Sequence, residues 1–222
     1  MAVVRLYVVE YCNFNSQADY NSNTTEDGFK QGGLGIGVSG VNSTLWNNYN
    51  SDNPFVPCGV TNSLGNNTGV ISYTDSTLGT VNISSYRGIE NPFGHIWKWI
   101  DGININESSG TITVYTCNEP SKFADDTSSN YTARVSFAKP SNGFISAFNW
   151  DSNGDFIPTA TGGTDKSCLY DYSYWNTGWR ALVCGGCANI GSSCGWFCFR
   201  ACHVSGVVGA AFGGRLYYTP GV

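Results

Sequence analysis

Short β-rich runs separated by turn-forming residues are the feature that most restricts the fold of this 222-residue chain. Each run is rich in β-branched or aromatic residues and is bounded by turn formers, which is typical of strands. The predicted strands cover residues 2–10, 69–74, 80–86, 110–117, 131–138, 143–150 and 180–184. Helical periodicity is weak and limited to residues 38–48 and 119–128, which predict short helices. We therefore expect an α+β architecture of short antiparallel strands with long loops and one or two short helices.

The length and the lack of a long polar linker predict a single domain over residues 1–222. Residues 1–60 are expected to contribute an N-terminal strand and helix region. The glycines of residues 32–37 lack the following Lys and Ser or Thr of a phosphate-binding loop, so a turn is the better interpretation.

Charged residues make up only 12% of the chain, about half of the usual share. The net charge of −5 argues against nucleic acid and anionic membranes as partners. No apolar run is long enough to cross a membrane, and the N-terminus lacks the order of a signal peptide. The abundance of Gly, Asn, Ser, Tyr and Trp is instead typical of a protein surface that binds a partner.

Residues 179–218 have the most unusual composition. They contain five of the nine cysteines, and positions 181–214 have no Lys, Asp, Glu, Gln, Met or Thr. An odd number of cysteines excludes a fully paired monomer, although some pairs could still form disulfides. The same cysteines offer a Cys-x-x-Cys pair at Cys184 and Cys187, but a zinc site needs two such pairs separated by a structured loop. A thiol redox site lacks the strand-to-helix context that it needs.

Other chemical sites are weakly indicated. Residues 151–155 place Asp151, Asn153 and Asp155 at the spacing of a calcium loop but lack the closing glutamate, so a β-turn explains them as well. His95 lies in an aromatic-rich run and is expected to be a core residue. The spacing of Glu90 and Asp101 alone does not support an acid and base pair.

Three motifs in order give the chain a resemblance to a known family. They are GHIWKWIDG at 94–102, RALVCGG at 180–186 and GGRLYY at 213–218. Together they resemble the formylglycine-generating-enzyme branch of the C-type lectin fold, which implies a C-type lectin-like domain. The residues that match the structural signature of that branch are Gly94, Trp97, Trp99, Arg180, Gly185, Gly186, Gly214 and Arg215.

The resemblance implies either an oxidase or a binding module. In the copper-dependent oxidase, active-site cysteines lie four and nine residues beyond the paired glycines, where this chain has Ile190 and Gly195. The cysteines therefore miss the catalytic positions, and we expect a non-enzymatic protein without a cofactor or bound metal. A copper oxidoreductase and a cysteine-rich metal module remain as alternatives.

The binding branch comprises the variable proteins of diversity-generating retroelements, which include phage tail proteins and bacterial surface ligands. In these proteins, adenines of Asn codons of the form AAC are randomised, so the resulting codons end in C and cannot encode Lys, Gln, Glu, Met or Trp. We predict a variable, exposed ligand-binding face within residues 179–218. Its residues are Cys184, Cys187, Ala188, Ile190, Cys194, Cys198, Arg200, Cys202, His203 and Val204. Val207 and Val208 also belong to the permitted set, whereas Trp196 must be a fixed position.

The sequence thus predicts a hypervariable receptor-binding domain of a phage or prophage tail. Its expected partner is a protein or glycan of the host cell surface, and its expected location is the virion tail tip or the bacterial surface. A homotrimer is expected from the resemblance, because trimers are common among tail tips. Sugar binding through the usual calcium-dependent lectin motif is not expected, because the chain has no Glu-Pro-Asn or Gln-Pro-Asp triplet.

Overall fold

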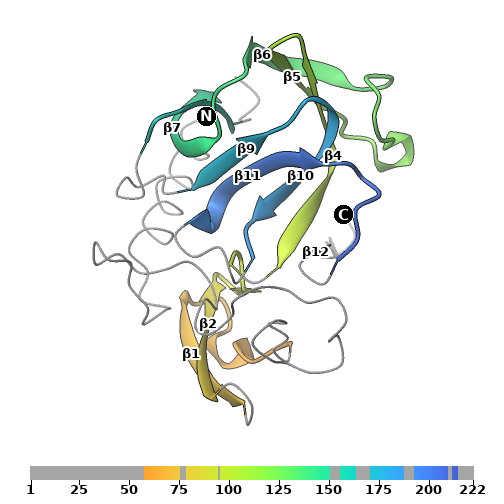
Figure 1. Cartoon of the computed structure of the whole chain (residues 1–222). Helices are drawn as coiled ribbons and strands as arrows, with labels where there is room; N and C mark the ends of the chain where they lie inside the picture. The colour runs from red at the N-terminus through yellow and green to blue at the C-terminus, as the bar shows by residue number, and fades with distance from the viewer. Residues whose placement is uncertain are drawn as a thin grey trace.

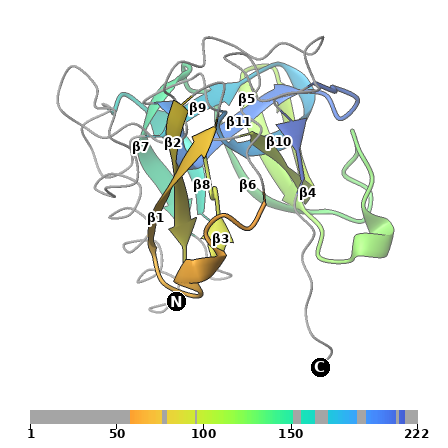
Figure 2. The same cartoon turned by 90° about the horizontal axis from the view of Figure 1, so that it is seen from below.

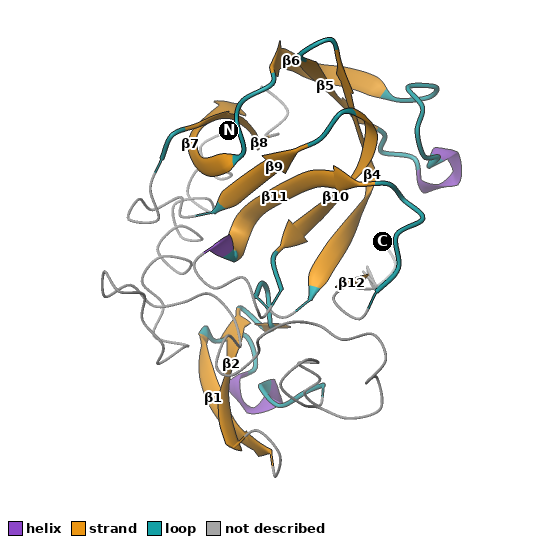
Figure 3. Ribbon diagram, in the orientation of Figure 1, coloured by secondary structure: helices purple, strands orange, loops and turns teal. Residues whose placement is uncertain are grey.

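The described part of the protein is built almost wholly from β-strands (Figure 3). The computed structural model describes residues 58–75, 79–94, 96–150, 156–163, 171–187, 193–209 and 212–214. These residues contain no α-helix, and their 3₁₀ turns include η1 (Asn62–Leu64) and η2 (Pro120–Lys122). The expected α+β, C-type lectin-like fold is therefore wrong for the described residues, which form an all-β structure.

Most strands belong to one large sheet with the order β6-β5-β4-β10-β11-β9-β7-β8, and β12 also pairs with β4. Neighbours are antiparallel except for the parallel pairs β9–β11 and β4–β12. The sheet curls into a nearly closed, barrel-like form (Figures 1 and 2). Its strands are β4 (Trp97–Ser108), β5 (Thr111–Thr116), β6 (Thr132–Ala138), β7 (Gly143–Trp150), β8 (Phe156–Thr161), β9 (Tyr172–Trp175), β10 (Gly178–Gly185), β11 (Gly195–His203) and β12 (Phe212–Gly213).

A smaller antiparallel sheet, below the large one in Figure 1, consists of β1 (Gly69–Asp75), β2 (Gly79–Tyr86) and β3 (Ile89–Glu90). Glu90 ties the preceding turn to this sheet. Its carboxylate accepts hydrogen bonds from the Gly59 amide at 3.0 Å, the Thr61 amide at 2.7 Å and the Thr61 hydroxyl at 2.8 Å. Glu90 therefore has a structural task as a hydrogen-bond acceptor for backbone and hydroxyl groups.

The predicted helix at residues 119–128 is also wrong. Only η2 forms there, and Phe123 already has an extended backbone. The side-chain amide of Asn104 donates hydrogen bonds to the backbone carbonyls of Ala124 at 2.7 Å and Thr127 at 2.9 Å. Because these carbonyls bond to a β4 side chain, the segment gains its backbone partners from tertiary structure rather than from a helix. The predicted helix at residues 38–48 and the predicted strand at residues 2–10 lie outside the described residues.

The two faces of the large sheet bury different residues. On the concave inner face, Ile105, Ile112, Trp175, Leu182 and Phe199 belong to the main core. On the convex outer face, a second cluster forms around buried residues, with Trp99 and Phe212 packed against it. The buried members of this second cluster are Trp97, Val183, Cys187 and Cys198.

Strand β4 bends where its pairing with β10 is interrupted. Leu182 of β10 pairs with Ile100, whereas the neighbouring Ala181 pairs with Asn104. Gly102 lies within this interruption with a φ of +76°, and a Cβ there would lie 2.7 Å from the carbonyl oxygen of Cys117. The bend therefore requires glycine, both for the backbone conformation and for the close approach of Cys117.

Candidate functional site

Strands β10 and β11 supply the frame of the predicted binding face. Val183 of β10 pairs with Trp99 of β4 on one side and with Arg200 of β11 on the other. Arg200 in turn pairs with Tyr174 of β9. Directly paired residues point to the same face of a sheet. Trp99, Val183, Arg200 and Tyr174 therefore form one row across four strands on the outer face.

Three of the predicted binding residues are buried rather than exposed. Cys187 is 4% exposed, Cys194 is 3% exposed and Cys198 is 0% exposed. Cys187 and Cys198 pack in the outer cluster beside Trp97, and the Cys194 thiol donates a hydrogen bond to the Cys187 carbonyl at 2.9 Å. The prediction that these side chains form an exposed face is wrong, because Trp97, Trp99 and Phe212 cover that part of the sheet.

Burial also governs the chemistry of the thiols. It raises the pKa of Cys184 to about 12, and it raises the pKa of Cys194 and Cys198 well above the ordinary value. The nearby carboxylate of Asp171 raises all three further. A nucleophilic cysteine needs a thiolate, which this environment disfavours. In the part of the chain that the structure describes, no group of three or more His, Cys, Asp or Glu is placed to hold a metal ion.

The predicted residues that remain accessible lie at the end of β11 and in the turn that follows it. We call Arg200, Cys202, His203, Val204 and Val208 the outer patch. Arg200, Cys202 and His203 are half-buried, whereas Val204 is 42% exposed and Val208 is 90% exposed. The amide of Val207 donates to the carbonyl of Val204 at 3.2 Å, which closes the turn between them.

Aromatic rings hold the polar members of the outer patch in place. The Arg200 guanidinium lies over the Trp97 ring, 4.7 Å from its centroid, and 5.6 Å from that of Tyr174. The His203 ring meets Phe212 edge-on, with centroids 4.9 Å apart, and Phe212 stacks on Trp99 at 5.5 Å. Arg200 and His203 are therefore oriented before any partner arrives.

Charge at the outer patch is positive and has no acidic counterpart in the described residues. The buried Nε atoms of Arg180 and Arg200 have no hydrogen-bond partner. Burial, and then the charges of Arg200 and Arg180, lower the pKa of His203, which keeps this ring neutral at pH 7. A guanidinium whose Nε makes no hydrogen bond keeps a donor for a ligand, and Arg is common among the residues that dominate binding energy.

The structure brings together several residues of the expected structural signature. The amide of Gly94 donates to the carbonyl of Gly185 at 2.9 Å, which joins the β3–β4 connection to the end of β10. Gly94, Gly185 and Gly186 all have positive φ values, which glycine adopts readily. Trp97 is buried at 3% exposure, and Gly214 is exposed. Ala188, Ile190, Arg215, His95 and the calcium-like loop at 151–155 lie outside the described residues.

Two buried carboxylates that organise this region carry no sequence motif. The Phe197 amide, near the start of β11, donates to the Asp171 carboxylate, and the Asp171 carbonyl accepts from the Ile145 amide at 3.1 Å. Asp171 thereby joins β11 to β7. Asp171 lies in a segment that has no secondary-structure signal in the sequence. The only sequence clue to its role is therefore that an acidic residue stands between predicted loops.

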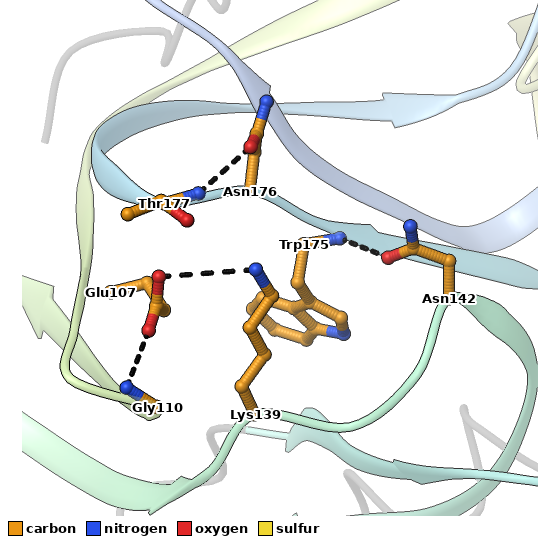
Figure 4. A network of polar contacts seen from close by, with 7 residues as sticks. All are labelled: Glu107, Gly110, Lys139, Asn142, Trp175, Asn176 and Thr177. Atoms are coloured by element: carbon orange, nitrogen blue, oxygen red, sulfur yellow. Dashed lines mark hydrogen bonds and ion pairs between the residues drawn. The ribbon is translucent and has the colours of Figure 1, made fainter.

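Glu107 is the second buried carboxylate (Figure 4). It is 5% exposed, accepts a hydrogen bond from the Gly110 amide at 2.7 Å and lies 3.8 Å from the Lys139 ammonium. The side chain of Thr177, the Gly110 amide and the charge of Lys139 lower the pKa of Glu107 against the effect of burial. The residue thus connects the β4–β5 turn to the segments that follow β6 and β9.

Comparison of the chain with protein-family models, with curated proteins and with solved structures gave no match. Among the described residues, no helix has the length and apolar character needed to cross a membrane.

Proposed function

We propose that this protein is a non-enzymatic ligand-binding domain whose variable residues recognise a partner on a bacterial surface. In this proposal it is a variable protein of a diversity-generating retroelement, located at the tip of a phage or prophage tail or on a cell surface. The partner is a host protein or glycan. A homotrimer is the expected assembly.

One observation carries the proposal. Arg200, Cys202, His203, Val204 and Val208 are all partly or fully exposed, and all can be encoded by randomised codons that end in C. They lie at the end of β11 and in the turn after it, beside rigid elements held by Trp97 and Gly185. Residues can change in such a turn without loss of the core, because the sheet beneath does not depend on them.

The burial of Cys187, Cys194 and Cys198 narrows the proposed contact surface to the outer patch. Randomisation can still reach buried positions, but only residues that fit the outer cluster leave the fold intact. Cysteine is small and apolar enough to satisfy this requirement. The buried cysteines are then products of variation retained by packing, while the outer patch makes the contacts.

The oxidoreductase alternative gains no support from the described thiols. The positions at which that family has its active-site cysteines hold Ile190 and Gly195 in this chain.

The DNA around the coding sequence tests the hypervariability directly. We expect a near-copy of the segment that encodes residues 180–215 close to a reverse-transcriptase gene. The two copies should differ almost only at adenines of the template. A near-copy whose differences fall evenly over all four bases would contradict the proposal, and so would the absence of any near-copy from a complete genome.

A further inference from the structure

The inner face of the curved sheet lines a partly open cavity of about 340 Å³. Its walls come from β4, β5, β10 and β11, which are neighbours in the sheet, and from β7 and β8, which the curvature of the sheet brings to the same cavity. The apolar side chains that form most of the wall include Ile103, Val114, Ile157, Leu182, Phe197 and Phe199.

A void of this size is not ordinary core packing. Protein interiors are packed as tightly as organic crystals and contain few voids larger than a water molecule. Cavities of about 300–1,000 Å³ are the usual size of small-molecule sites, and small β-barrels commonly hold one ligand inside. The dimensions and the apolar wall therefore fit a bound molecule with a mainly hydrocarbon body.

Among the described residues that line the cavity, Lys98 is the charged one. Lys98 of β4 pairs with Cys184 of β10, and its ammonium lies 3.4 Å from the carbonyl oxygen of Ile96. Gly185 stands beside it, since a Cβ there would lie 3.5 Å from the Lys98 Nζ. An ammonium at the edge of an apolar space favours a ligand that carries one negative group.

The volume of the cavity limits the number of heavy atoms in the ligand. At about 30 Å³ for each water-sized group, the space accommodates about eleven such groups. Ile100 lines the cavity and is 37% exposed, so it lies at the opening to solvent.

We propose that this cavity binds a straight-chain monocarboxylate of about eight to ten carbons in all, its carboxylate at Lys98. The site is separate from the outer patch. Cavity residues such as Leu182 and Phe199 belong to the inner core, whereas Arg200 and Val183 belong to the outer face. The proposal therefore does not depend on the proposed function, and either can fail alone.

Calorimetric titration of the full chain with octanoate and with 1-octanol tests the site. The two probes have the same chain length and differ in charge. We expect saturable binding of both, with octanoate the tighter. Absence of saturable octanoate binding by the folded wild-type protein would overturn the proposal.

Three variants separate the charge from the cavity. Lys98→Met should raise the octanoate Kd at least tenfold and leave the octanol Kd unchanged, whereas Lys98→Arg should retain octanoate binding. Ile100→Trp should weaken both probes at least tenfold, because the indole fills the opening. The matched control Val204→Trp changes a similarly exposed residue of the outer patch and should bind both probes like the wild type.

Each variant is first checked for a cooperative thermal transition by circular dichroism. Position 100 is partly exposed, so the Ile100→Trp variant should fold even if Lys98→Met does not. Equal octanoate affinity in Ile100→Trp and Val204→Trp would place the ligand elsewhere and overturn the proposal. An equal loss of octanol and octanoate binding in Lys98→Met would overturn the role of its charge.

Discussion

At the scale of single residues, two buried carboxylates help to determine how the strands meet. Glu107 and Asp171 accept backbone hydrogen bonds from Gly110 and Phe197, and each joins segments far apart in the chain. A carboxylate that is bonded in the folded state and hydrated in the unfolded state makes stability depend on pH. Glu107 provides a test of this principle because its pKa is lowered by identified partners.

The pH dependence follows from the sign of that shift. The folded protein has a lower Glu107 pKa than the ordinary 4.5, so the unfolded state binds the proton more readily. The stabilisation by Glu107 is then complete above about pH 4.5 and is lost as the pH falls through the lower folded-state value. Glu107→Gln should reduce stability at pH 7 and flatten the decline of stability below pH 4.5.

Urea denaturation of the wild type and of Glu107→Gln at a series of pH values measures both effects. Glu119→Gln is the matched control, because Glu119 is an exposed carboxylate paired only with Lys122. The control should keep the wild-type pH profile. Parallel profiles for the wild type and Glu107→Gln would show that Glu107 carries no such linkage.

At the scale of elements, the strands with strong alternation could be predicted from the sequence, and those stabilised by their neighbours could not. Strand β5 (TITVYT) alternates β-branched residues and buries Ile112 and Val114 as expected. Strand β11 (GWFCFRACH) contains glycine and cysteine, carries a weak strand signal and is fixed by pairing with β10 and β9. The helix predicted at 119–128 failed because Asn104, distant in sequence, takes its carbonyls as acceptors.

The residues of the candidate site also divide into those that the sequence could predict and those that it could not. The codon restriction predicted Arg200 and Val204 as exposed residues, and both are at least partly exposed. The burial of Cys198 depends on Phe212, which returns to pair with Trp97 on β4. A contact between segments this far apart leaves no local pattern in the sequence. The inner cavity likewise arises from the curvature of the whole sheet.

Thiol reactivity tests the arrangement of β10 and β11. At a pKa of about 12, the Cys184 thiolate at pH 8 is about a thousandfold scarcer than that of an ordinary thiol with a pKa of 9.0. We expect iodoacetamide to modify the exposed Cys58 first and to modify Cys184, Cys194 and Cys198 at least tenfold more slowly. Site-resolved mass spectrometry over time provides the rates.

The same labelling in urea is the internal control, since unfolding should bring all of these cysteines to similar rates. If Cys194 and Cys198 react as fast as Cys58 in the native protein, the outer cluster does not cover them. Their burial, and the restriction of the contact surface to the outer patch, would then be incorrect.

At the scale of the whole molecule, the two faces of one curved sheet serve different purposes. The inner face buries the main core and lines the cavity, while the outer face carries Arg200 on Trp97 and the exposed turn after β11. Because the sheet connects both faces rigidly, substitutions in the turn should change recognition without changing the fold. This separation of a constant frame from a variable surface is the central claim.

Retention of labelled protein on a panel of bacterial strains tests this claim most directly. The double variant Arg200→Ala with Val208→Glu removes the cation that lies over the Trp97 ring and places charge on the most exposed patch residue. Ala133→Glu, an exposed position on β6, serves as the matched control. The account predicts that the wild type and Ala133→Glu bind the same strains, while the folded double variant loses at least tenfold in retention. The account is contradicted if all three proteins are retained equally, or if none of them is retained on any strain.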